Sequence, residues 1–245
     1  MKQTAALQLN PIIEWAIDKV MRLIAVLLTG RRLKTLVASG LEHVPCQGPA
    51  LLVVRHYHHL FDGLAFFAAV ERRFHIVVTL DWARNRRTRF FMSSLNTLAR
   101  WPMVLREEAI ENSPKENRLY TASDLRRYQL AALRQSVKLL EENRLLVIFP
   151  EGFPYIDPVF TPKTHADEFL PFKPGFAAVA ESAEKVMHQT IPIIPTGIRY
   201  DTGSTWVAHI SFGAPIYRRD FPSRQCFIDL VADTVKRLSG LQAEN

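Results

Sequence analysis

The fold follows from one stretch of sequence, Leu51-Leu52-Val53-Val54-Arg55-His56-Tyr57-His58-His59-Leu60-Phe61-Asp62-Gly63. Its first four residues form an uninterrupted apolar run, which is typical of a strand buried on both faces in a parallel sheet. A second such run, residues 145–149, is followed by Glu151-Gly152. Polar residues therefore stand directly after two predicted strands. Because ligands bind beyond the carboxyl ends of strands in open α/β sheets, these residues predict a site there.

Outward from these two strands, strand-like and helical segments alternate along the chain. Further strands are predicted at residues 75–80, 191–194 and 206–212, and helices at residues 63–72, 88–98, 122–142 and 175–187. Alternation of this kind predicts an α/β fold with a mostly parallel central sheet flanked by helices. The charged segment 107–118 and the proline-containing segment 155–174 are predicted to be surface loops.

Composition bounds the class of protein. The 245 residues, 48% of them hydrophobic, suffice for one sizeable core. We therefore expect a single α/β domain over residues 41–245, preceded by an N-terminal helical membrane-docking element over residues 1–40. A net charge of +7 favours an anionic partner, such as a membrane surface, a phosphorylated substrate or nucleic acid. Two cysteines are too few for a disulfide framework, which favours a reducing compartment.

The N-terminal element is predicted to be an amphipathic helix over residues 11–29. Glu14, Asp18 and Arg22 recur every four residues and place one polar stripe along an otherwise apolar helix. A membrane-spanning helix needs roughly 20 mostly uncharged residues, so this pattern indicates a helix that lies on an apolar surface instead. That surface is either the protein's own core or a membrane. The basic residues that follow the helix suit a membrane; they are Arg31, Arg32 and Lys34.

A second basic segment, residues 84–92, combines four arginines with Phe90, Phe91 and Met92. Such a composition suits an anionic membrane surface and also RNA. We expect no nucleic-acid partner, because no RNP-like, KH-like or helix-turn-helix pattern occurs. The N-terminus also lacks the basic start, the apolar stretch and the cleavage site of a signal peptide. We therefore expect a cytoplasmic protein that is peripherally associated with the inner face of the membrane.

Four blocks of the sequence resemble those of the glycerophospholipid acyltransferase family, whose members acylate lysophosphatidate and glycerol phosphate. Residues 51–62 resemble the family's strand followed by an N-H-x-x-x-x-D block, and residues 101–106 resemble its block that ends in arginine. Phe149-Pro150-Glu151-Gly152 matches its F-P-E-G block, and residues 191–195 match its apolar run that ends in proline. Residues 172–175 and 212–216 also look like segments of that family. The likeness extends over residues 41–216, although each block alone is a weak signal.

The resemblance implies an O-acyltransferase similar to 1-acylglycerol-3-phosphate acyltransferases. Such an enzyme moves a fatty acyl group from a thioester, either acyl-CoA or acyl carrier protein, to the hydroxyl of a lysophospholipid or a related lipid alcohol, without a cofactor. The resemblance also implies that Arg106 and the turn formed by Phe149, Pro150, Glu151 and Gly152 hold the acceptor. An arginine suits a phosphate because its planar guanidinium donates paired hydrogen bonds.

The histidines of the first block suit acyl transfer on chemical grounds. Attack by an alcohol requires removal of its proton, and imidazole is a natural base near neutral pH. A nearby carboxylate orients the ring, and Asp62 is the candidate, although an aspartate at a helix start also serves as a cap. The family's histidine lies five residues before its aspartate, where this chain has Tyr57. His56 and His58 are both candidates for the base; we favour His56 because it directly follows the strand.

Three departures from the family's pattern bear on the acceptor. Arg55 replaces an asparagine of the first block, Arg100 stands where the second block usually has glycine, and Phe153-Pro154 stand where Thr-Arg commonly follows F-P-E-G. Loss of that last arginine weakens the case for a simple glycerol phosphate acceptor. Either Arg55 and Arg100 replace its charge, or the acceptor is another lipid, a carotenoid or a sugar alcohol.

Two other classes of function fit parts of the sequence. A basic membrane- or RNA-binding protein without catalysis would leave His56 and Asp62 unused. A metal-dependent hydrolase would need further ligands from His165, His188 or His209, which stand in no recognisable motif, so we expect no metal. A serine hydrolase is disfavoured because the sequence contains no G-x-S-x-G motif.

Overall fold

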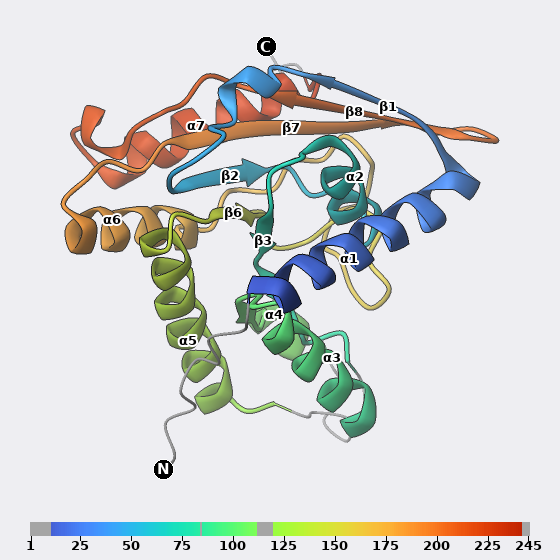
Figure 1. The fold of residues 1–245 in the computed structure, drawn as a ribbon, viewed down its shortest axis with the longest axis horizontal. Helices are drawn as coiled ribbons and strands as arrows, with labels where there is room; N and C mark the ends of the chain where they lie inside the picture. Colours follow the sequence, from blue (N-terminus) through green and yellow to red (C-terminus); the bar gives the residue numbers. More distant parts are fainter. Residues whose placement is uncertain (1–10, 84, 112–119, 242–245) are drawn as a thin grey trace.

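A curled central sheet organises the computed structural model, which describes residues 11–83, 85–111 and 120–241 (Figure 1). The strands of this sheet are β1 (Leu33–Ser39), β2 (Ala50–Val54), β3 (Phe74–Ile76), β6 (Leu145–Ile148), β7 (Ile193–Asp201) and β8 (Trp206–Phe212). Their spatial order is β1-β8-β7-β2-β6-β3. Neighbouring strands run parallel except β7 and β8, which are antiparallel. The predicted mostly parallel sheet is therefore confirmed.

Helices cover both faces of the sheet. They are α1 (Pro11–Arg32), α2 (Phe61–Ala69), α3 (Arg86–Leu98), α4 (Glu107–Glu111), α5 (Ala122–Glu141), α6 (Gly175–Met187) and α7 (Arg224–Leu238). Two short 3-10 helices, Leu41–His43 and Arg218–Asp220, lie in the connections. Helix α7 was not predicted. The predicted helices coincide with α2, α3, α5 and α6 to within a few residues.

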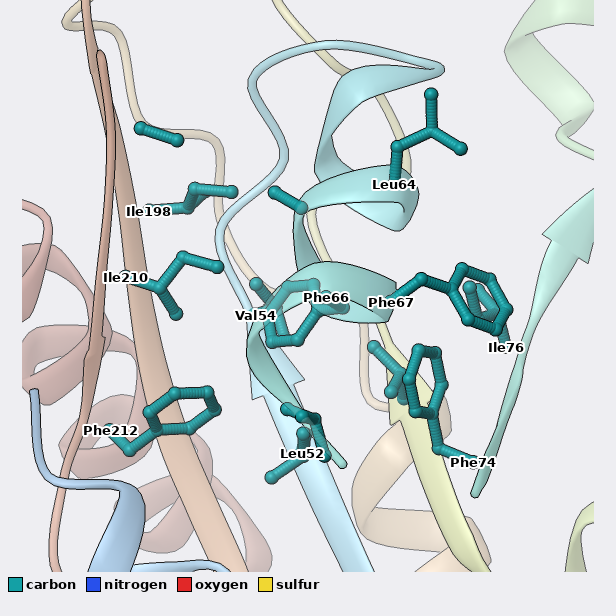
Figure 2. Close-up of a cluster of buried hydrophobic side chains, with 14 of the residues drawn as sticks. Leu52, Val54, Leu64, Phe66, Phe67, Phe74, Ile76, Ile198, Ile210 and Phe212 are labelled. Carbon is teal, nitrogen blue, oxygen red and sulfur yellow. The ribbon is translucent and has the colours of Figure 1, made fainter. Parts of the chain in front are cut away.

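The central strand β2 explains the uninterrupted apolar run, because its side chains alternate between two covered faces. Leu52 and Val54 pack in a cluster with Phe66 and Phe67 of α2, which Figure 2 shows. Leu51 and its neighbours on the other face pack against α5, α6 and α7. All residues of β2 are consequently buried. The carboxyl end of β2 and the chain that follows it are thereby held between two helical layers.

The segment between α2 and α5 differs from the sequence prediction in one strand and one loop. The expected strand over residues 75–80 divides into β3 of the main sheet and β4 (Val78–Thr79), which pairs with β5 (Met103–Val104). The division follows from a change of partner, since the Val77 amide donates to Val147 and the Val78 amide to Pro102. The expected loop over residues 107–118 begins with helix α4, and residues 112–119 lie outside the described residues.

Strand β1 was not predicted. It pairs in parallel with β8, from Leu33 opposite Trp206 to Ser39 opposite Ser211. The sequence-based division counted residues 33–39 with the N-terminal element, whereas the structure places them in the main sheet. The part of the chain before this strand that the structure describes is helix α1.

Helix α1 turns its polar stripe toward the protein. The Glu14 carboxylate lies 3.1 Å from a guanidinium nitrogen of Arg73, 3.1 Å from one of Arg100 and 3.0 Å from one of Arg144. Burial alone would raise the pKa of Glu14, but hydrogen bonding to Arg100 and the charges of the three arginines outweigh it and lower that pKa. Arg22 donates to backbone carbonyls at the end of α2. Ion pairs and hydrogen bonds therefore fix this face of α1 to the domain.

The opposite face of α1 is apolar and exposed. Trp15, Leu23 and Leu27 are 55%, 58% and 64% exposed, and Ile12 and Val26 are exposed on the same side. A helix that packs on a core buries its apolar side, so α1 is oriented in the opposite sense. Within the described residues, no helix is long and apolar enough to span a membrane.

Candidate active site

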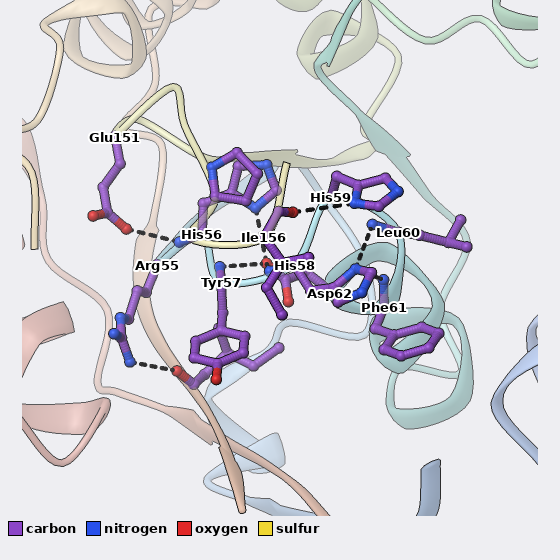
Figure 3. A network of polar contacts seen from close by, with 12 residues as sticks. Arg55, His56, Tyr57, His58, His59, Leu60, Phe61, Asp62, Glu151 and Ile156 are labelled. Carbon is purple, nitrogen blue, oxygen red and sulfur yellow. Dashed lines mark hydrogen bonds and ion pairs between the residues drawn. The ribbon is translucent and has the colours of Figure 1, made fainter. Parts of the chain in front are cut away.

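His56 and Asp62 meet at the carboxyl end of β2. The chain leaves the strand at Val54 and enters α2 at Phe61, which makes Asp62 the second residue of the helix. The Nδ1 atom of His56 lies 2.8 Å from Oδ2 of Asp62, and the Asp62 carboxylate is fully buried (Figure 3). The His56 side chain keeps 16% of its surface exposed. The sequence-predicted pair is therefore brought together, with the imidazole on the accessible side.

Three further groups donate hydrogen bonds to the Asp62 carboxylate. The backbone amides of Tyr57 and His58 lie 2.7 and 3.0 Å from Oδ2, and the hydroxyl of Tyr200 lies 2.8 Å from Oδ1. The Asp62 carboxylate therefore serves as a hydrogen-bond acceptor for all three groups. An acceptor beside His56 fixes the tautomer of the ring with its hydrogen on Nδ1, which leaves Nε2 as an acceptor.

His58 has a different role from His56 in the turn. Its Nδ1 atom accepts hydrogen bonds from the backbone amides of Leu60 and Phe61, at 3.1 and 3.3 Å. These are amides at the start of α2 that lack helical partners. The ring of His58 stacks between those of His59 and Phe61. The structure therefore places the His58 side chain as a cap of α2.

Glu151 braces the chain behind His56. Its Oε1 atom accepts from the His56 amide at 2.8 Å, and its Oε2 atom lies 2.7 Å from Nζ of Lys163. The same Nζ donates to the His56 carbonyl at 2.8 Å, and both side chains of the pair are fully buried. Burial lowers the pKa of Lys163, which the charge of Glu151 partly offsets. Glu151 does not line the large cavity that adjoins the His56 ring.

A cavity of about 1090 Å³ adjoins the His56 ring. It reaches between helices α1, α2, α3, α5 and α6, and most of its wall is apolar. Representative apolar residues of the wall are Leu64, Phe67, Ile76, Trp101, Leu133 and Phe149. The ring of Phe149 also stacks on His56, with 4.4 Å between the ring centroids. A large apolar cavity beside a polar pair is typical of a site for an elongated apolar ligand.

Arg106 lines one part of the cavity wall. Three residues of the turn after β6 line it as well; they are Phe149, Pro150 and Gly152. Gly152 has a φ of 78°, a conformation that favours glycine. The Arg106 guanidinium is ion-paired to Asp81 and Asp157 and lies 3.3 Å from the Gly152 carbonyl. Burial would lower the pKa of Arg106, but the two carboxylates outweigh it and raise that pKa.

Arg55 and Arg100 lie away from the cavity. Arg55 is buried and donates to the carbonyls of Ala166 and Ile198. Arg100 pairs with Glu14 and, at 2.7 Å, with Glu142. Neither arginine lines the cavity wall, so neither brings a charge to it.

Metal coordination has no assembled ligand set in the described part of the chain. There, no three His, Cys, Asp or Glu side chains are grouped as metal ligands would be. His56 and Asp62 contact each other, and His209 pairs with Asp201 at 2.8 Å on β7 and β8.

Sequence reasoning missed Tyr200 and Lys163. Tyr200 lies on β7, 138 positions from Asp62, and Lys163 lies in the loop after β6, 107 positions from His56. Nothing in the spacing of the sequence links either residue to the first block. Lys163 is one of several charged residues in the segment predicted to be a surface loop, and no local signal marks it as buried.

Comparisons with known proteins bear on the family and on the fold. A family model described as Acyltransferase matches residues 36–199, more than half of the chain. Comparison with curated proteins gave no match. Among solved structures, the fold is similar to the crystal structure of the 1-acyl-sn-glycerophosphate (LPA) acyltransferase PlsC from Thermotoga maritima, with a TM-score of 0.55 and 16% identity, over 94% of this chain and 81% of that one. By the match of its family model, the chain belongs to the acyltransferase family.

Proposed function

We propose that the protein transfers a fatty acyl group from a thioester, acyl-CoA or acyl carrier protein, to the hydroxyl of a lysophospholipid or a related lipid alcohol. The observation that carries this proposal is the His56 imidazole, held by the buried Asp62 at the wall of a large apolar cavity. The cavity accommodates acyl chains, and the polar wall near Arg106, Phe149, Pro150 and Gly152 faces the acceptor head.

His56 acts as the general base in this proposal. Its Nε2 atom takes the hydroxyl proton of the acceptor while the alkoxide oxygen attacks the thioester carbonyl. A carbon–oxygen bond forms, the carbon–sulfur bond then breaks, and the imidazolium returns the proton to the departing thiolate. Asp62 steadies the positive charge of the ring during the step, and Glu151 with Lys163 holds the His56 backbone in place.

An acylation assay tests the proposal. Purified protein is incubated with labelled acyl-CoA or acyl carrier protein and a set of lysolipids and neutral lipid alcohols, and the products are resolved by mass. We expect an ester product together with one free thiol for each acyl group transferred. Release of thiol at the same rate with and without acceptor would identify a thioesterase and contradict the proposal.

Tyr200 is a positioning residue in this scheme. The Tyr200 side chain is buried, and burial together with the Asp62 charge raises its pKa well above the usual value of 10, so its hydroxyl stays a hydrogen-bond donor. For Tyr200→Phe we expect kcat to fall about tenfold with little change in KM, because the base loses orientation while the substrates keep their contacts.

A matched control is Tyr120→Phe, which removes another buried tyrosine hydroxyl that donates to a backbone carbonyl, that of Leu80. We expect Tyr120→Phe to lower thermal stability about as much as Tyr200→Phe does and to leave kcat unchanged. Equal kcat in the two variants would show that Tyr200 supports only the fold.

The exposed apolar face of α1 is proposed to attach the enzyme to the cytoplasmic face of the membrane. Phe90 and Phe91 of α3, 76% and 65% exposed, add apolar surface beside basic residues of the same helix. Rings and aliphatic chains enter the lipid interface while arginines attract anionic head groups. The side chains of Arg31, Arg32 and Lys34, which were expected to contribute, lie outside the described residues, as does Arg84.

Leu23→Asp tests this attachment. We expect flotation with anionic vesicles to fall about tenfold or more, since one apolar side chain leaves the interface and a like charge enters it. Val186→Asp places the same charge on an apolar residue of α6 that is 54% exposed, and it is expected to float like the unmodified protein. Equal flotation of both variants would refute the assignment of α1, and retention on RNA without flotation would favour nucleic acid.

A further inference from the structure

We infer that the acceptor carries a neutral or zwitterionic head group and not a phosphomonoester. This inference rests on the proposed acyl transfer and refines it. It concerns the polar wall of the cavity, where the head of the acceptor meets Arg106.

Buried groups of the protein already engage the Arg106 guanidinium. Its Nε atom donates to Asp81 at 2.8 Å, and its Nη2 atom lies 2.6 Å from the same carboxylate oxygen. Its Nη1 atom donates to Asp157 at 2.9 Å and to the Gly152 carbonyl. The side chains of Asp81, Arg106 and Asp157 are 2%, 4% and 4% exposed. The Nη2 atom makes its ion-pair contact with Asp81 without a hydrogen bond, but the atom is buried. A guanidinium that binds phosphate through paired hydrogen bonds needs accessible donors, which this buried one does not offer.

The charge around Arg106 also opposes an anion. Arg106 is a single cation between the buried carboxylates of Asp81 and Asp157, so this group of three carries a net negative charge. The other charged residues of the cavity wall sum to zero; they are Glu107, Glu108, Arg126 and Lys173. A phosphomonoester would add up to two more negative charges next to buried carboxylates, where repulsion is weakly screened. Separating Arg106 from its partners would leave those carboxylates buried and unpaired, which is strongly unfavourable.

Phe153 fixes both cations in this arrangement. Its buried ring lies 4.4 Å from the Arg106 guanidinium and 5.4 Å from Nζ of Lys173. Phe153 and Pro154 stand where Thr-Arg is common in the family that the sequence resembles. The chain thus carries an aromatic ring in place of a polar residue and lacks the following cation. In the described residues, Arg55 and Arg100 do not replace that charge at the cavity.

A panel of acceptors with one common acyl chain tests the inference. The panel contains a monoacylglycerol, lysophosphatidylcholine and lysophosphatidate, presented in neutral detergent micelles with acyl-CoA or acyl carrier protein, whichever serves as donor. We expect kcat/KM for lysophosphatidate to be at least about tenfold below that of the better of the other two, the effect of one unfavourable charge at close range. Highest kcat/KM for lysophosphatidate would overturn the inference and leave the proposed acyl transfer standing. Failure of every acceptor would overturn both.

A charge variant tests the stated cause. Asp157→Asn removes one carboxylate charge and keeps an oxygen for the Val159 and Phe160 amides that Asp157 now serves. We expect the ratio of kcat/KM for lysophosphatidate to that for monoacylglycerol to rise about tenfold. Asp201→Asn removes the same charge from the far end of β7, and the ratio is expected to stay unchanged. An unchanged ratio in folded Asp157→Asn, judged by circular dichroism, would contradict the inference.

Discussion

Replacement of His56 by alanine is expected to lower kcat for acyl transfer by roughly a thousandfold, the range for loss of a general base. The expectation follows from the contact between its Nδ1 atom and the buried Asp62, which leaves Nε2 available at the cavity. Initial rates of ester formation, measured at saturating acceptor, give the value. Circular dichroism checks that the variant is folded.

The matched variant is His58→Ala, in the same turn. It removes a side chain that caps α2, so we expect a loss of about 1 kcal/mol in the free energy of unfolding and less than a tenfold loss in kcat. Survival of activity in His56→Ala, together with its loss in His58→Ala, would reverse the assignment of the base.

Replacement of Lys163 by methionine is expected to destabilise the protein by about 3–5 kcal/mol, the usual result of breaking a buried ion pair. Methionine has a similar length, but it leaves the Glu151 carboxylate buried without its cation and the His56 carbonyl without a donor. Urea unfolding followed by fluorescence measures the change. Glu151 binds the amide of His56 and Lys163 binds its carbonyl. Because the catalytic imidazole loses this support, we expect kcat to fall as well.

Lys138→Met is the control for this effect. Lys138 pairs with Glu141 at 3.9 Å on the surface of α5, and such exposed pairs contribute about 0–1 kcal/mol. The double variant Lys163→Met with Glu151→Leu removes both buried charges and is expected to regain part of the lost stability. If Lys163→Met and Lys138→Met unfold at the same urea concentration, the buried pair does not hold the loop.

The local features of the fold were predictable from the sequence because local chemistry determines them. Apolar runs marked β2 and β6, and the spacing of apolar residues marked α5 and α6. The positions of His56 and Asp62 at a strand end followed from the same runs. Their contact could be anticipated because only a short turn separates β2 from α2.

The features that sequence reasoning missed depend on distant parts of the chain. The division of β3 from β4 arises where the backbone exchanges one partner strand for another. Helix α7 begins at a Ser223 cap and carries a regular apolar face, so its signal was present but overlooked. Strand β1 follows α1 without a turn signal, and it lies at the edge of the sheet, where its partner, β8, comes much later in the chain.

The orientation of α1 and of Glu151 illustrates the same limit. The polar stripe of α1 was evident, but the arginines that attract Glu14 come from three separate segments, and only the folded chain assembles them. Glu151 was expected to face the acceptor because it belongs to the F-P-E-G block. The Lys163 side chain and the His56 and Leu170 amides instead hold its carboxylate behind the strand end.

The parallel pairing of β1 with β8 has a consequence for biosynthesis. Ser39 and Ser211, whose hydroxyls lie 3.3 Å apart, are separated by 172 positions, so β1 leaves the ribosome long before its partner exists. A contact of such long range is slow to form. Arg73, Arg100 and Arg144, which pair with Glu14 in the folded protein, are also translated after the α1 segment. The apolar residues of α1 therefore emerge before the partners of its polar stripe, so the proposed membrane attachment does not require a complete sheet.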